Sequence, residues 1–268
     1  MTTPPTPSPA RALRIVLKFG TGILTETGSP NLDGAQVWKL LREVAAIRRA
    51  GHDIIVVTSG AVAAGLNVMG YPQRPAEMAA LQACAAVGQS RLMHFYEQVL
   101  REWNLHVGQM LVTHEDFEIA ERQLHIRNTL GELLRNRAVV PVFNENDSVA
   151  IEEIRFGDND ALSASVAVLA RADLLVLLTS VDGLMPPGGS GIVREVRDMQ
   201  EVAGFARSEK GDFSVGGMES KLAAVQKAVE HGVETVIASG RRPQQLADLI
   251  AGQGIGTRFF PARNVPVV

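Results

Sequence analysis

The sequence predicts an α/β fold, a three-layer sandwich in which helices cover both faces of a mostly parallel, open sheet. Short runs rich in valine, isoleucine and leucine alternate along the chain with longer runs whose apolar residues recur at helical spacing. The run DLLVLLT at 173–179 is almost wholly apolar, as expected of a parallel strand that is covered on both faces. With 268 residues, 46% of them hydrophobic and 21% charged, the chain suits one large globular domain.

Strands are expected where short apolar runs lie between turn-forming residues. In chain order, the predicted strands are Arg14–Phe19, Asp53–Thr58, His106–Val112, Val139–Phe143, Asp173–Thr179, Val233–Ala238 and a last strand near Arg258–Phe260. A small hairpin is also predicted at Ser148–Phe156, because apolar and polar residues alternate there.

Helices are expected between these strands. In the first helix, apolar residues from Val37 to Ile47 recur at intervals of three or four, and Gly51 follows as a terminator. The later predicted helices are Ala76–Trp103, Glu115–Arg137, Ala161–Arg171, Met218–His231 and Pro243–Ile250. The long second helix carries many small residues, which fits either the protein core or a subunit interface, and we favour the core.

The composition excludes several classes of function. The net charge of −3 and the pI of about 6.1 give no sign of nucleic-acid binding, and the single cysteine, Cys84, excludes a disulfide framework. No apolar run approaches the roughly 20 residues of a membrane helix. The proline-rich start, residues 1–11, is unlike a signal peptide and is expected to be a disordered tail. We therefore expect a cytoplasmic protein with no membrane or nucleic-acid partner, and a flexible insert at Met185–Ile192.

Common catalytic signatures are missing. The phosphate loop GxxxxGK[ST] needs a Gly-Lys pair, which the chain lacks, and the GxGxxG fingerprint fails because Thr25 stands where its last glycine is needed. His114 and Glu115 have no second histidine at the spacing of a zinc site, and neither Ser59 nor Ser90 lies in a GxSxG motif. The sequence therefore gives no specific support for a P-loop enzyme, a dinucleotide oxidoreductase, a metalloprotease or a serine hydrolase.

Two glycine-marked turns follow the first two strands, where open α/β sheets bind ligands. Lys18 lies in an otherwise apolar strand, so its ammonium must meet either water or an anion, and Gly20 and Gly22 would let backbone N–H groups approach a phosphate. The turn Thr58-Ser59-Gly60 leads into a helix whose N-terminus suits an anion, although Ser59 also suits a simple helix cap.

The third and fourth turns carry the densest polar residues. NEND (144–147) directly follows a strand and GDND (157–160) precedes a helix; their amides and carboxylates suit a substrate with an ammonium group, or hold lysines in position. Glu152 and Glu153 fit a solvated hairpin face. Lys221 stands in the first turn of a helix, where a cation opposes the helix dipole unless an anion binds there; a plain surface lysine is the alternative. Two lysines beside glycine turns indicate phosphoryl transfer.

With these motifs in place, the chain resembles the amino acid kinase family, and most closely its members that phosphorylate glutamate. The matching stretches are VLKFGTGILT (16–25), VTSGAVAAG (57–65), AAVGQSRLM (85–93), HVGQMLVT (106–113), VVPVFNENDSVAIEEIRFGDNDALSA (139–164), DLLVLLTSVDGL (173–184) and GGMESKLAA (216–224). The joint presence of NEND, GDND and GGMxSK is specific to that branch of the family.

The resemblance implies a single kinase catalytic domain over 12–268, without the C-terminal PUA domain found in many members. It further implies ATP-dependent phosphorylation of the side-chain carboxylate of L-glutamate, the first step of proline biosynthesis. Magnesium would be carried on the ATP phosphates, with no metal site on the protein itself. A homo-oligomer, dimer or tetramer, is implied, as is proline as a feedback inhibitor, because 114–127 resembles the region tied to that control.

The resemblance also implies roles for individual residues. Lys18 and Lys221 would neutralise the transferring phosphoryl group, and Asp160 would orient both lysines. The implied glutamate-binding residues are Ser59, Asn144, Asp147 and Asn159. The implied ATP-binding residues are Lys18, Gly20, Gly60, Thr179, Ser180, Gly216, Gly217, Met218 and Lys221, with backbone N–H groups offered by Gly20 and Gly60. The chain departs from the usual family pattern at Gly22, Ser180, Val215 and the insert 185–192.

Three alternatives remain open from the sequence. The first is a kinase for another acidic amino acid, which a substrate panel would separate. The second is a catalytically silent nucleotide-binding or metabolite-sensing protein, which Ser180 and Val215 would suit, while Lys18, Lys221 and Asp160 argue against it. The third is an oxidoreductase, the least favoured because the dinucleotide fingerprint fails.

Overall fold

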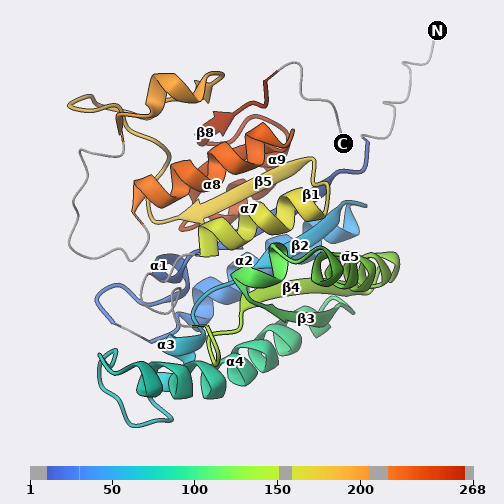
Figure 1. The fold of residues 1–268 in the computed structure, drawn as a ribbon, viewed down its shortest axis with the longest axis vertical. Helices are drawn as coiled ribbons and strands as arrows, with labels where there is room; N and C mark the ends of the chain where they lie inside the picture. Colours follow the sequence, from blue (N-terminus) through green and yellow to red (C-terminus); the bar gives the residue numbers. More distant parts are fainter. Residues whose placement is uncertain (1–10, 30, 151–158, 206–216, 263–268) are drawn as a thin grey trace, which may run out of the picture.

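A single eight-stranded sheet runs through the protein (Figure 1). The computed structural model describes residues 11–29, 31–150, 159–205 and 217–262. In spatial order β3-β4-β2-β1-β5-β7-β8-β6, every neighbouring pair is parallel except β7 and β8. The strands are β1 Arg14–Phe19, β2 Asp53–Val57, β3 His106–Val112, β4 Val139–Glu145, β5 Leu174–Thr179, β6 Glu195–Val196, β7 Glu234–Ser239 and β8 Gly256–Phe259. The predicted α/β class with a mostly parallel open sheet is confirmed.

Helices flank the sheet in the predicted order. They are α1 Thr21–Leu24, α2 Gly34–Arg49, α3 Ala61–Leu66, α4 Met78–Arg101, α5 Ala120–Arg135, α7 Asn159–Leu169, α8 Met218–Glu230 and α9 Leu246–Ile250. Short 3₁₀ helices are η1 His114–Phe117, η2 Met199–Val202 and η4 Pro243–Gln245. Within the ranges described above, none of these helices combines the length and the apolarity needed to cross a bilayer.

The structure differs from the sequence predictions in two places. The helix expected at Glu115–Arg137 is split, because Thr113 caps η1 through a reciprocal capping box with Asp116 and a separate helix starts at Ala120. The two-residue strand β6, too short to show a period, was not expected. Residues 151–156 of the predicted hairpin lie outside the described residues, and the insert 185–192 contains neither helix nor strand.

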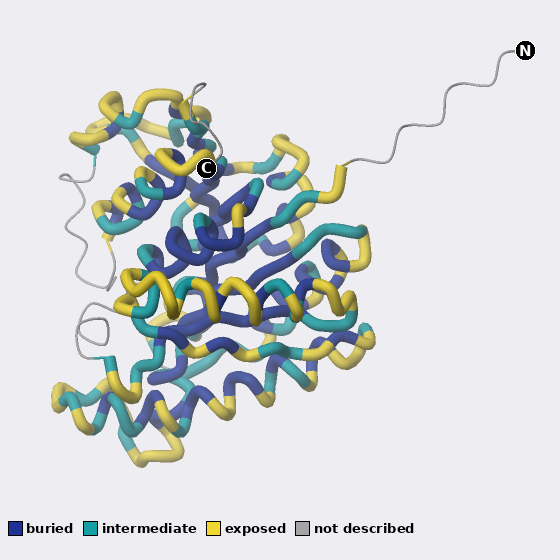
Figure 2. Tube along the Cα trace, turned by 45° about the vertical axis from the view of Figure 1, so that its right-hand side comes forward, coloured by how far each residue is buried: buried dark blue, intermediate teal, exposed yellow. Residues whose placement is uncertain are grey.

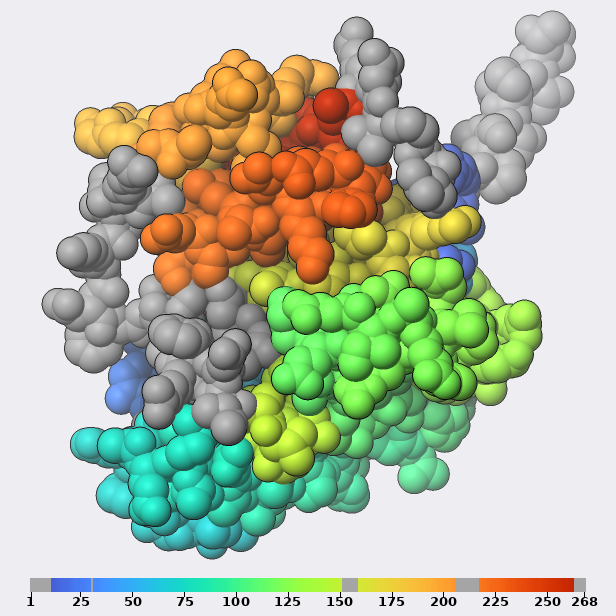
Figure 3. Space-filling model, in the orientation of Figure 1, coloured from blue at the N-terminus to red at the C-terminus, as the bar shows by residue number. Residues whose placement is uncertain are grey.

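Side-chain alternation along the strands divides the core into two layers, one on each face of the sheet. In β1, Ile15, Leu17 and Phe19 pack toward α2, α4 and α9, whereas Val16 packs toward α5, α7 and α8. Figure 2 shows the buried sheet between helices whose outer sides are exposed, and Figure 3 shows α5 and α8 on one surface with part of α7 between them. The same alternation places Lys18 on the face of Val16, toward α7 and α8.

The chain order reverses around β1, which pairs with β2 on one side and with β5 on the other. In open parallel sheets such a switch point leaves a crevice at the carboxyl ends of the strands. The carboxyl ends of β1, β2, β4 and β5 therefore lie together at one edge, where the predicted site residues follow.

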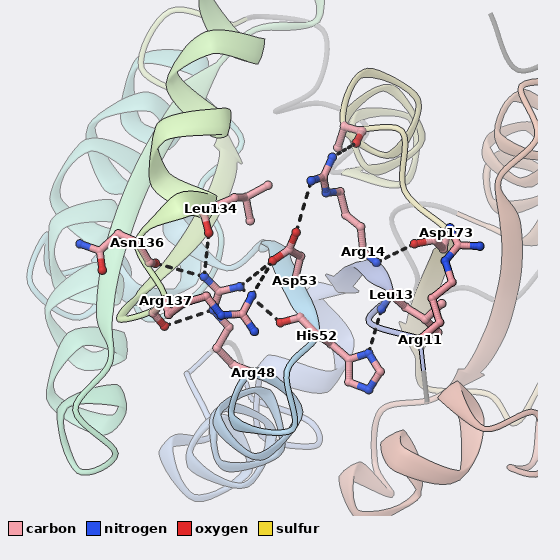
Figure 4. A network of polar contacts seen from close by, with 11 residues as sticks. Arg11, Leu13, Arg14, Arg48, His52, Asp53, Leu134, Asn136, Arg137 and Asp173 are labelled. Carbon is pink, nitrogen blue, oxygen red and sulfur yellow. Dashed lines mark hydrogen bonds and ion pairs between the residues drawn. The ribbon is translucent and has the colours of Figure 1, made fainter. Parts of the chain in front are cut away.

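The opposite edge of the sheet is held by an arginine network (Figure 4). The Arg48 side chain is 1% exposed, and its guanidinium donates to Asp53 Oδ1 at 2.9 Å and to the backbone carbonyl of His52 at 3.3 Å. It also donates to the carbonyl oxygens of Leu134, Asn136 and Arg137, between α5 and β4. All five N–H donors of the Arg48 guanidinium therefore have acceptors. These bonds connect α2 with β2 and with the α5–β4 connection.

Helices α3 and α4 cross with their backbones in direct contact. A Cβ atom at Gly88 would overlap the backbone of Ala61 and Gly65, and one at Gly65 would overlap the backbone of Cys84. Cys84 and Ala85 are buried at this crossing, whereas Ala79 and Ala86 are exposed, so the core interpretation holds for only part of this helix.

We predict that Gly88→Ala lowers the free energy of unfolding by about 1–3 kcal/mol, because a rigid backbone must move to admit the methyl group. Gly131→Ala in α5 is the matched control: a Cβ there meets no atom within 4 Å, so higher helix propensity should raise stability by about 0.5–1 kcal/mol. Urea denaturation of both variants measures the difference. Equal effects of the two substitutions would contradict the backbone contact.

Candidate active site

Two lysines share one buried carboxylate at the carboxyl ends of the strands. Lys18 Nζ lies 2.5 Å from Asp160 Oδ1, and Lys221 Nζ lies 3.0 Å from Asp160 Oδ2. The exposed fractions of the three side chains are 5%, 12% and 1% for Lys18, Lys221 and Asp160. The three residues come from the end of β1 and the first turns of α8 and α7, so the sheet edge and two neighbouring helices assemble the group.

The charges of this group sum to +1, from two ammonium groups and one carboxylate. Removing charge from water is costly, and the shared carboxylate offsets part of that cost. A phosphate brought next to the lysines would be attracted by both ammonium groups. The arrangement therefore favours binding of a phosphate between Lys18 and Lys221, with Asp160 keeping the two ammonium groups side by side.

The residues expected to bind ATP lie near the same edge but differ in what they offer. The N–H of Gly20 donates to the carbonyl of Leu178 at 3.2 Å, so this amide, expected to face a phosphate, is already used inside the sheet. Gly60 has φ 92° next to Leu24 and Leu32, a conformation that favours glycine. Gly60 thus turns the chain into α3.

Two further residues expected to bind ATP lie at the end of β5, where Thr179 pairs with Ser239 of β7 and Ser180 follows with an exposed side chain. Gly217 is the N-cap of α8 and leaves open space around its Cα. The side chain of Met218 is buried in the core, so this residue can offer a ligand only its backbone. Gly216 lies outside the described residues.

Three of the four expected glutamate-binding residues form one buried polar cluster. Asn159 Nδ2 donates to Asn144 Oδ1 at 2.8 Å, to Ser59 Oγ at 3.2 Å and to the carbonyl of Thr58 at 2.5 Å. Asn159 directly precedes Asp160, which places this cluster next to the two lysines. The cluster is therefore continuous with the cationic group.

The fourth residue, Asp147, lines a cavity of about 280 Å³ beside the cluster. The same cavity is lined by Glu145, Gln89 and Gln109, which the sequence analysis did not single out as binding residues. The available signal was their position, since Glu145 lies inside NEND and both glutamines lie inside stretches that match the family. Two carboxylates on one wall suit a substrate that carries an ammonium group.

Burial and a neighbouring charge shift the titration of Asp147. Loss of hydration, followed by repulsion from the Glu145 carboxylate, raises the pKa of Asp147 to about 6, while the Arg74 guanidinium acts in the opposite direction. Asp147 is thus ionised at neutral pH and becomes protonated in mildly acidic solution. Among the residues with described positions, no three histidine, cysteine or acidic side chains gather as a metal site.

Comparison with known proteins places this geometry in context. Residues 13–239 match the model of the amino acid kinase family. A glutamate 5-kinase from Sodalis glossinidius is 47% identical over 251 residues, which cover 91% of this chain and 68% of that protein. A glutamate 5-kinase from Cronobacter sakazakii is 47% identical over 256 residues, covering 93% of this chain and 69% of that protein.

A solved structure shares the fold. Carbamate kinase from Giardia lamblia bound to AMP-PNP superposes with a TM-score of 0.64 at 18% identity, over 94% of this chain and 99% of that chain. At that identity the likeness concerns the arrangement of strands and helices only. The family match, by contrast, covers every described strand except β8, and it includes Lys18, Asp160, Lys221 and the polar cluster. The chain therefore belongs to the amino acid kinase family and, within it, to the glutamate 5-kinases.

Proposed function

We propose that this protein transfers the γ-phosphoryl group of ATP to the side-chain carboxylate of L-glutamate, giving L-glutamyl 5-phosphate and ADP, the first step of proline biosynthesis. The observation that carries the proposal is the buried Lys18–Asp160–Lys221 group, which lies beside the polar cluster that includes Asn159. The 47% identity to glutamate 5-kinases supports the choice of substrate.

The reaction joins two anions, so its main obstacle is electrostatic. A side-chain carboxylate is already ionised at neutral pH, and its attack needs no general base. One carboxylate oxygen forms a bond to the γ-phosphorus while the bond from that phosphorus to the bridging oxygen breaks, and ADP leaves. Lys18 and Lys221 would neutralise the oxygens of the moving group, and Asp160 would hold both ammonium groups at the same place.

The rest of the substrate fits the cavity wall. With its side-chain carboxylate toward the lysines, the amino-acid end extends toward Asp147 and Glu145, whose charges suit the ammonium group. Ser59, Asn144 and Asn159 would line the path between these two ends. The distance between two charged sites then favours an acidic amino acid of defined length.

Four further features are proposed on the family resemblance. ATP is used as its magnesium complex, the ion travelling with the substrate. Proline acts as a feedback inhibitor, the protein assembles as a homo-dimer or homo-tetramer, and it works in the cytoplasm. Inhibition of turnover by proline tests the feedback control. Light scattering of the purified protein tests the oligomeric state.

The direct test of the proposed function traps the product. With ATP, magnesium and hydroxylamine, we expect glutamate to yield the γ-hydroxamate in step with ADP release, because an acyl phosphate reacts with the amine. Aspartate serves as the shorter control substrate. Folded protein that releases no hydroxamate from glutamate would refute the proposal.

We predict that Lys221→Ala lowers kcat about 10²–10³-fold with the fold intact, because one of two cations on the phosphoryl group is lost. Lys227→Ala is the matched control on the same helix, since Lys227 Nζ donates to Ser165 Oγ at 2.7 Å and takes no part in the site. Steady-state rates of both variants are compared. An active Lys221→Ala enzyme would remove Lys221 from the mechanism.

We predict that kcat/KM for glutamate falls below pH 6 at saturating ATP. The pKa of Asp147 is about 6, so lower pH protonates the carboxylate that should hold the substrate ammonium. Below that pKa, kcat/KM should fall about tenfold for each pH unit. Rates from pH 5 to 7.5 measure the inflection. In Asp147→Asn the inflection should vanish, and its persistence there would assign it to another group.

A further inference from the structure

A chain of four side-chain amides runs from Asn159, next to Asp160, to Gln109 in the wall of the cavity. Asn159 of α7 donates to Asn144 of β4 at 2.8 Å, and Asn144 Nδ2 donates to Gln89 Oε1 of α4 at 2.8 Å. Gln89 Nε2 in turn donates to Gln109 Oε1 of β3 at 3.1 Å. The first three of these side chains are buried, so water is not an alternative partner for them.

This chain has a direction that the backbone determines. Its first amide, Asn159, meets the carbonyl oxygen of Thr58 at 2.5 Å, and a carbonyl can only accept a hydrogen bond. Asn159 must therefore present its NH₂ group to this side, and Asn144 must answer with its oxygen. Each following amide accepts from the one before it through its oxygen and donates to the next through its NH₂ group, because these two groups lie at opposite corners of the amide.

The polarity ends at the cavity. Gln109 uses its oxygen to accept from Gln89, so its own NH₂ group is the donor that remains at the end of the chain. Gln89 and Gln109 both line the cavity, together with Glu145 and Asp147. On a wall with two carboxylates, an N–H donor is the group that a substrate carboxylate needs.

We propose that Gln89 is a positioning residue that sets substrate specificity: it holds the Gln109 amide with its N–H donor toward the α-carboxylate of the amino acid. This inference rests on the proposed function, which puts the side-chain carboxylate at the lysines and the ammonium at Asp147. The remaining α-carboxylate then lies at the far end of the cavity, where Glu145 would repel it and Gln109 can bind it.

The test reverses the orientation of the Gln109 amide, the last member of the amide chain. In Gln89→Glu the new carboxylate still accepts from Asn144 but cannot donate to Gln109, so the Gln109 amide turns over and presents its oxygen to the cavity. L-isoglutamine, which keeps the side-chain carboxylate and carries an amide in place of the α-carboxylate, donates to such an oxygen. We expect the ratio of kcat/KM for glutamate to kcat/KM for isoglutamine to fall about ten- to a hundredfold.

The added charge of Gln89→Glu is controlled by Ser90→Glu, which places a carboxylate on the next residue of the same cavity wall without entering the amide chain. A ratio that falls as far in Ser90→Glu as in Gln89→Glu would overturn the proposal. Gln89→Met, with no charge and no polar atom, should give a ratio between wild type and Gln89→Glu, and an unchanged ratio there would also overturn it.

Failure of this inference is distinguishable from failure of the proposed function. Wild-type protein that makes no hydroxamate from glutamate would remove the function itself. Active wild-type protein whose specificity ratio is unaffected by both Gln89 substitutions, with thermal unfolding showing folded variants, would remove only the role of Gln89.

Discussion

The structure depends most on the shared carboxylate of Asp160, which is buried and contacts two lysines at once. Without it, holding Lys18 and Lys221 away from water would be costly, because burial removes the hydration of an ammonium group. The carboxylate also fixes how far apart the two cations lie. An enzyme that transfers a phosphoryl group between anions needs this positioning more than it needs covalent chemistry.

The pleat of the sheet separates two polar assemblies that meet at the site. Lys18 follows Val16 on the face of α7 and α8, where the other two members of the charged group lie. Asn144 follows Val142 on the face of α4, where it meets Gln89. Asn159 and Asp160 are adjacent at the start of α7 and join the two assemblies. The Asn159 side chain belongs to the amide chain, and the Asp160 side chain belongs to the charged group.

Rigid packing elsewhere keeps these assemblies in register. At the far edge of the sheet, Arg48 ties α2 to the α5–β4 connection, and near the site the backbones of α3 and α4 touch at Gly65 and Gly88. Tyr96 of α4, fully buried, pairs its hydroxyl with that of Thr58 at 2.7 Å. Helix α4 thus holds both the end of β2 and the amide chain, so its position affects the polar cluster and the cavity.

The sequence by itself determined the fold class, seven of the eight strands in the described residues, and the residues Lys18, Asp160 and Lys221 as a set. These features depend on local patterns, on the cost of a lysine in an apolar strand, and on motifs specific to one family. Helix ends were less predictable, as the split at Thr113 shows, because capping contacts decide them.

Only the tertiary structure decided which groups touch. It joined Asn144 to Gln89, 55 residues away, and it engaged the Gly20 amide within the sheet instead of leaving it for a phosphate. It also brought Glu145 and Gln109 to the cavity of Asp147. The physical reason is that hydrogen-bond direction and side-chain contact depend on how distant segments pack, and no local period in the sequence carries that information.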